Sequence, residues 1–175
     1  MDKTMKTPLT IPFALLAFSL SGCAFQETLK SGTENPCATL KDIVADYPTE
    51  FSAYRKGGTD FNTVTIYRAK EELIKGHCEV WAWGNADSAY VCTAGAPDPE
   101  VAATRYNQAV EQVSTCLGPR WAAEEEARER DGEAAGMVSR FRSPDAAMPV
   151  VSVHNVEDRW RRSVYLYIGS PARAL

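Results

Sequence analysis

Few residues of this chain could do covalent or acid–base chemistry. Its 175 residues include five cysteines and two histidines, His77 and His154. The sequence has no Gly-x-Ser-x-Gly, no His-Glu-x-x-His and no phosphate-binding glycine loop, the patterns that position a nucleophile, a catalytic metal or a nucleotide. Glu79 and His154 could form an acid–base pair, but Glu79 has no obvious second carboxylate with which to cleave a glycosidic bond. We therefore expect a protein that is not an enzyme and that uses no cofactor and no metal.

The N-terminus has the pattern of an export signal. Two lysines precede a mostly apolar run from Ile11 to Leu20, which is too short for a permanent membrane-spanning helix. The run ends in Leu20-Ser21-Gly22-Cys23, which resembles the lipobox of bacterial lipoproteins. The resemblance covers the first 24 residues and implies a signal peptide at 1–22, cleavage before Cys23, and lipidation of that cysteine. Ala24 stands where an aspartate would resemble an inner-membrane retention signal, so we expect anchoring in the outer membrane, facing the periplasm.

The overall charge of −4 argues against two classes of partner. Proteins that bind nucleic acid concentrate positive charge, and anionic lipid surfaces attract it as well. We expect membrane attachment through the N-terminal lipid, a protein partner in the envelope, and no nucleic acid.

Helix and strand patterns follow in a regular order. Asn35-Pro36 and Asp98-Pro99 each place an N-cap before a proline, and apolar residues at helical spacing follow both. These patterns predict helices over 36–47 and 98–117. Six runs with alternating side chains predict strands: 61–68, 77–83, 89–93, 135–142, 150–155 and 163–168. We interpret Gly57-Gly58 as a turn, and the charged run 124–131 as a solvated face or loop.

This order predicts an α+β fold, with two helices packed on one face of a mainly antiparallel sheet of about six strands. A duplicated αβββ unit is an option, although no residues match beyond the helix caps. We divide the chain into the signal peptide at 1–22, a lipidated N-terminus and tether at 23–35, and a single domain at 36–175.

The four cysteines other than Cys23 suit an oxidising compartment. An even number predicts two disulfides with three possible connectivities. A metal site would favour Cys-x-x-Cys pairs, which are absent, and His77 beside Cys78 is the only hint of one. Cys78 and Cys92 flank the 84–87 turn symmetrically, while Cys37 begins the first helix and Cys116 ends the second. We prefer the pairs Cys78–Cys92 and Cys37–Cys116.

Strand alternation predicts two unlike faces of the sheet. The residues that we place against the helices are Val64, Ile66, Val80, Ala82, Val151, Val153, Val164, Leu166 and Ile168. The opposite face would then carry Glu79, Ser152 and His154 together with seven candidate partner-binding residues: Tyr67, Trp81, Trp83, Arg140, Arg142, Tyr165 and Tyr167. Trp, Tyr and Arg are enriched at binding hot spots, so we expect this face to bind. A second small core on the same face is the alternative, because Tyr and Trp also favour strands without any function.

These features together predict a non-catalytic protein-binding module. Its size, disulfides and lipid anchor suit an inhibitor or immunity-type protein against an envelope-acting enzyme, such as a peptidoglycan or lipid hydrolase. Two alternatives remain open: a structural or assembly lipoprotein of an envelope complex, and a carrier of a small apolar ligand between sheet and helices.

Overall fold

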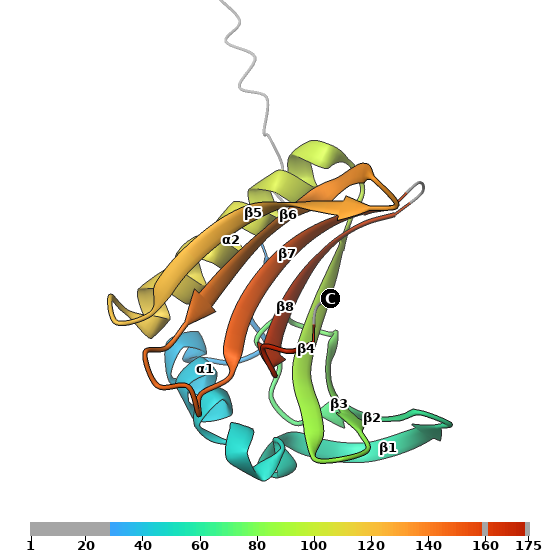
Figure 1. Ribbon diagram of the computed structural model, residues 1–175, viewed down its shortest axis with the longest axis vertical. Coiled ribbons are helices and arrows are strands. Elements are labelled where there is room, and N and C mark those ends of the chain that lie inside the picture. The colour runs from blue at the N-terminus through green and yellow to red at the C-terminus, as the bar shows by residue number, and fades with distance from the viewer. Residues whose placement is uncertain (1–28, 159–160, 174–175) are drawn as a thin grey trace, which may run out of the picture.

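The structure is a computed structural model that describes residues 29–158 and 161–173. The predicted signal peptide and Cys23 lie outside the described residues. The described part has an α+β fold, in which two α-helices lie on one side of a single antiparallel sheet (Figure 1). The elements are α1 Pro36–Ala45, the 3₁₀ helices η1 Tyr47–Thr49 and η2 Ser52–Tyr54, β1 Arg55–Phe61, β2 Val64–Ala69, β3 Cys78–Trp83, β4 Asp87–Ala96, α2 Pro99–Leu117, β5 Ala122–Arg130, β6 Glu133–Arg142, β7 Val150–Asp158 and β8 Arg161–Gly169.

The sheet has eight strands in the order β1-β2-β3-β4-β8-β7-β6-β5, not the expected six or so. Each half of the chain is a helix followed by a meander of four strands, and the halves join where β4 pairs with β8. Each half therefore has the element order αββββ, and not the αβββ considered from the sequence. The two additional strands, β1 and β5, are the two edges of the sheet.

Both helices begin as the sequence predicts. The side chain of Asn35 accepts a hydrogen bond from the backbone N–H of Ala38 at 3.1 Å, and that of Asp98 accepts one from Val101 at 2.8 Å. These bonds satisfy N–H groups that have no partner within the helix, and the proline that follows each cap starts the first turn.

The main core lies between the helices and the sheet. Helix α2 packs across β4, β7 and β8, and α1 packs on α2. The disulfide Cys37–Cys116 links the start of α1 to the end of α2, so the predicted pair is confirmed and the two halves are covalently joined. Leu40, Ile43, Tyr106 and Val113 from the helices pack with buried strand residues from both halves.

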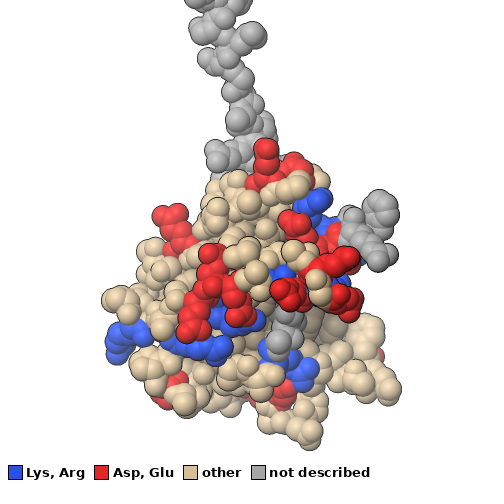
Figure 2. All heavy atoms as spheres, turned by 45° about the horizontal axis from the view of Figure 1, so that its top comes forward, with Lys and Arg blue, Asp and Glu red and all other residues tan. Residues whose placement is uncertain are grey.

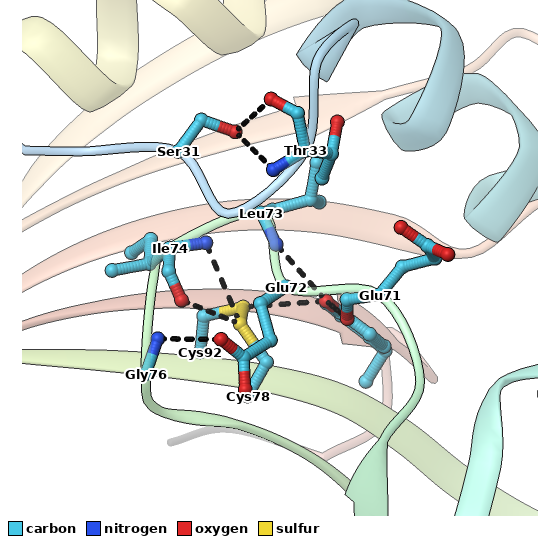
Figure 3. Close-up of a disulfide and its surroundings, with 10 residues drawn as sticks. Ser31, Thr33, Glu71, Glu72, Leu73, Ile74, Gly76, Cys78 and Cys92 are labelled. Carbon is cyan, nitrogen blue, oxygen red and sulfur yellow. Dashed lines mark hydrogen bonds between the residues drawn. A yellow bond between two sulfur atoms is a disulfide. The ribbon is translucent and has the colours of Figure 1, made fainter.

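The second predicted pair, Cys78–Cys92, is also confirmed, and its cysteines face each other on β3 and β4. The loop 70–77 covers it (Figure 3). The Tyr90 hydroxyl holds this loop: it donates to the Glu71 carbonyl at 2.7 Å and accepts from the Leu73 N–H at 3.3 Å. Burial raises the pKa of Tyr90 above its ordinary value, so the phenol remains protonated.

Residues 29–33 lie against this loop, although the sequence suggested a tether that is separate from the domain. The Lys75 N–H donates to the Lys30 carbonyl and the Gly32 N–H donates to the Glu72 carbonyl, both at 2.9 Å. Leu29 packs against the main core. We call residues 29–33 the N-terminal strap.

The side chains of β2 lie on the opposite faces of the sheet from those expected. Tyr67 pairs with Val80 and packs against the main core, so it faces the helices, while Val64 and Ile66 face the other way. The ring of Tyr67 lies over Gly58, where any Cβ would come within 2.6 Å of it. Val64 and Ile66 instead lie opposite Trp83 and Trp81. Packing against two indoles on β3 and against a glycine on β1 therefore decides which side chains of β2 face the helices. The β-branched residues Val64 and Ile66 alone pointed to the wrong face.

Candidate functional site

We call the face of the sheet opposite the helices the open face. It carries a small second cluster, in which Trp81, Trp83 and Tyr165 are half-buried and pack on buried neighbours. The buried members are Ala89, Val91, Val150 and Tyr167. The expectation of an aromatic face and the alternative of a second core are thus each met in part, because Tyr167 is 1% exposed while the other three rings retain exposed surface.

The open face is concave. Trp81 on β3 and Arg128 on β5 line one cavity of about 860 Å³. In a flat sheet, the five strand spacings between β3 and β5 would separate them by about 24 Å. The sheet therefore curls away from the helices, with β1 and β5 at its two ends (Figure 1). We call this the large cavity; a small cavity of about 250 Å³, lined by Arg140, Arg142 and His154, lies on the same face.

The N-terminal half of the open face is apolar and aromatic. The rings of Trp81 and Trp83 meet edge to face with centroids 6.0 Å apart, and the Trp81 indole N–H donates to Glu79 at 2.7 Å. Ile66 lies beside Trp81, and by register Phe61 on edge strand β1 continues this surface, with 55% of its area exposed.

The C-terminal segment reaches onto the aromatic half. The guanidinium of Arg173 lies 3.7 Å from the ring centroid of Trp83, and its Nε donates to Asp87 at 2.8 Å. The cation–π contact and the ion pair to Asp87 together hold the segment over Trp83. Of the two indoles, Trp81 is therefore the one not covered by Arg173.

The C-terminal half of the open face is charged and hydrogen-bonded along β5, β6 and most of β7, whereas Val150, Tyr165 and Tyr167 belong to the second cluster. Arg140 on β6 forms an ion pair with Glu126 on β5, and Arg142 is exposed. Acidic and basic side chains lie interspersed in the view of Figure 2, which turns the top of Figure 1 towards the reader. No single sign of charge dominates this view.

His154 lies at the centre of the charged half and is almost completely buried. Arg128 contacts its Nδ1 at 2.6 Å, and Ser152 Oγ contacts its Nε2 at 2.8 Å. Because a guanidinium can only donate, Nδ1 is the acceptor and the neutral ring carries its proton on Nε2. Burial, with Arg128 and Arg140 nearby, lowers the pKa of His154 to about 3.

This arrangement is unlike that of a serine nucleophile with a histidine base. The Nε2–H of His154 donates to Ser152, whereas a general base must accept the serine proton on a free ring nitrogen. Glu79 and His154 do not form the acid–base pair either, because Glu79 is bound to Trp81 and both ring nitrogens of His154 are occupied. The geometry suits a structural, neutral histidine.

Six of the seven candidate residues lie on the open face, and Tyr67 does not. Trp81, Trp83, Arg140, Arg142 and Tyr165 are accessible to different degrees, while Tyr167 supports them from beneath. The candidates that sequence reasoning missed are Phe61, Ile66, Arg128 and Arg173. Arg128 lies on an edge strand that resembled a loop, and Ile66 was assigned to the wrong face.

No family model matches this chain, and no curated protein or solved structure matches it. Within residues 29–158 and 161–173, neither helix is long and apolar enough to cross a membrane.

Proposed function

We propose that this protein is a lipoprotein of the outer membrane, facing the periplasm, whose open face binds and blocks an envelope-acting enzyme. The observation that carries the proposal is the concave face on which Trp81, Tyr165 and exposed arginines lie together, uncovered by the helices. Aromatic and arginine side chains supply most of the energy of protein interfaces, and a concave surface suits a protruding loop of a partner.

The rigidity of the scaffold supports a binding role. The open face belongs to one continuous sheet, and two disulfides on its covered side link β3 to β4 and α1 to α2, so we expect the face to be ordered before a partner arrives. A face that is ordered in advance loses less conformational entropy on binding, which favours tight inhibition.

The alternative function, carriage of a small apolar ligand between the sheet and the helices, has less support. Among the described residues, the cavity bounded by the strap, the helices and the sheet, lined by Leu29, Leu40, Ile74 and Val113, has a volume of about 30 Å³. That volume holds about one water molecule, whereas ligand pockets measure about 300 Å³ or more. An assembly lipoprotein remains the second proposal, because the same face could dock on a membrane complex.

The test compares capture by matched variants. The mature chain in a non-ionic detergent serves as bait for an envelope extract, and the captured protein is then purified for affinity measurements. We expect Trp81→Ala to weaken binding by about 30-fold or more, the effect of removing a hot-spot side chain. Arg142→Ala should weaken it less, and Arg120→Ala, which removes an exposed arginine just after α2, should have no effect.

Equal affinity of the Trp81→Ala variant and the wild type would contradict the proposal. Capture of an enzyme whose activity is lost on binding would support inhibition. Capture of an outer-membrane complex without enzymatic activity would support the assembly role instead.

A further inference from the structure

Arg128 is a half-buried cation with no acidic partner among the described residues. Its recorded contact is to the neutral ring of His154 at 2.6 Å. The charged groups that act on it most are the guanidiniums of Arg140 and Arg130, which, after burial itself, lower the pKa of Arg128. A desolvated cation without a counter-ion is unfavourable, so the site favours an incoming anion.

An irregularity in the edge strand aims Arg128 at the large cavity. The register between β5 and β6 shifts between Ala127 and Glu129, so that Arg128 and Glu129 both line this cavity. Gly136 on β6 has φ +111°, and a Cβ there would come within 1.9 Å of the Asn155 carbonyl oxygen. Bulges of this kind often redirect a side chain at a functional position.

Two aromatic side chains line the same cavity. Trp81 and Tyr165 line it, and its volume of about 860 Å³ admits one or more side chains of another protein. The guanidinium of Arg128 has five N–H donors, and the recorded bond to His154 uses one of them. The remaining donors could hold a carboxylate in two parallel hydrogen bonds while apolar atoms of the ligand contact the rings.

We propose that the large cavity binds one Asp or Glu side chain on a loop of the partner protein, with its carboxylate on Arg128 and apolar atoms of the same loop against Tyr165 and Trp81. This inference rests on the proposed function and adds the chemistry of the partner. The cavity takes a single carboxylate and not an acidic stretch, because its three arginines, Arg128, Arg130 and Arg161, are matched in number by Glu129, Glu157 and Asp158, so that further negative charge would be repelled. Asp158 lies 3.8 Å from Arg130, which further favours Arg128 as the receptor for the ligand.

The experiment needs no partner protein. The ¹⁵N-labelled mature chain in a non-ionic detergent is titrated with acetyl-Gly-Glu-Gly-amide, with its Gln counterpart, and with inorganic phosphate. Resonances of the Arg128 Nε–H and the Trp81 indole N–H are followed by NMR. We expect saturable shifts of both signals with the Glu peptide, a dissociation constant of roughly a few millimolar, and binding at least about tenfold weaker for the Gln peptide.

Variants and salt test the role of the charge. Arg128→Gln should abolish the response of Trp81 to the Glu peptide, whereas Arg120→Gln should leave it unchanged. Binding by the wild type should weaken as salt is raised, because salt screens the attraction between Arg128 and the approaching carboxylate. The Glu and Gln peptides are compared on the wild-type protein, so that comparison still tests the inference if the Arg128→Gln variant does not fold.

Equal shifts with the Glu and Gln peptides, or no saturable shift, would overturn this inference. Phosphate binding that is as tight as Glu-peptide binding would also overturn it, in favour of a small-anion site. Failure of this inference can be told apart from failure of the proposed function. If the protein binds the Glu peptide but captures no partner, the carboxylate site is supported and the proposed function is not. If it captures a partner through Trp81 but does not bind the peptide, the proposed function is supported and the carboxylate site is not.

Discussion

The two halves of the molecule have the same order of elements but different open faces. In both, a capped helix precedes four strands, and the face towards the helices is apolar. On the open face, β2 and β3 present Ile66, Trp81 and Trp83, whereas β6 and β7 present Arg140 and His154. The comparison teaches that the need for a common core makes the covered face alike in both halves, whereas the open face can differ between them and is therefore where specificity can lie.

Breaking the covalent link between the halves should have the largest effect. Cys37→Ser with Cys116→Ser opens a connection between residues 79 apart in sequence, and we expect a loss of about 4 to 5 kcal/mol from the free energy of unfolding. Cys78→Ser with Cys92→Ser, which acts within the N-terminal half over a separation of 14, should cost about 3 kcal/mol. Urea unfolding monitored by circular dichroism measures both. A larger loss for the second pair would contradict the view that the first joins two units.

The charged half should make the protein sensitive to acid. The folded-state pKa of His154, about 3, lies below the ordinary value of 6.5, so the unfolded chain binds the extra proton in the window between these values. The contribution of His154 is therefore present above pH 6.5 and is lost as the pH falls towards 3. Between pH 7 and pH 5 we expect a loss of about 2 kcal/mol, measured by urea unfolding.

A matched histidine provides the control for this prediction. His154→Gln should remove most of that pH dependence, whereas His77→Gln, at an exposed position, should keep it. Arg128→Gln should reduce the dependence too, because it removes one of the two guanidiniums that disfavour the protonated ring. Identical pH profiles for all the proteins would show that His154 titrates normally in the folded state.

Releasing the C-terminal segment from the aromatic half should have the smallest effect. Arg173→Ala removes the contact with Trp83 and the ion pair with Asp87, and we expect a loss of about 1 kcal/mol. Trp83 should become more hydrated, so the tryptophan fluorescence should shift to longer wavelength. Arg173→Lys should give an intermediate result, since an ammonium keeps the charge but cannot stack as a planar group. An unchanged emission spectrum in Arg173→Ala would indicate that the segment stays in place by other contacts.

The sequence predicts the inner part of this fold better than its edges. The helix caps, the six inner strands and the Cys78–Cys92 pair follow from local signals, such as Pro36, Pro99 and the symmetric placement of the two cysteines about a turn. The Cys37–Cys116 pair follows from the positions of its cysteines at the ends of the two helices. The edge strands β1 and β5 give no such signal, because both are largely exposed and lack an alternating apolar pattern. The charged residues of β5 also protect its edge from pairing with another chain. The run at 124–130 therefore resembles a loop, although it pairs with β6 along its length.

The charged edge strand β5 is held to the domain by contacts on its covered side, which the periodicity of the sequence does not reveal. On the covered side, Glu125 of β5 accepts a hydrogen bond at 2.7 Å from the hydroxyl of Tyr106 on α2, which also contacts Ser139. Burial is the main cause that raises the pKa of Tyr106 to about 12, so its hydroxyl remains protonated and can donate. Similarly, the orientation of Tyr67 depends on Gly58 of β1, which sequence reasoning assigned to a turn. An error about one edge strand therefore carried over into the face assigned to its neighbour.

The N-terminal strap brings the described domain to within a few residues of Cys23. With a lipid on Cys23, as we propose, six residue steps separate the anchored atom from Leu29, which is fixed to the body of the domain. A polypeptide of that length reaches at most about 20 Å, less than the diameter of a typical small domain. The protein would therefore work close to the membrane surface, and its targets would be enzymes that reach the inner leaflet of the outer membrane or the adjoining cell wall.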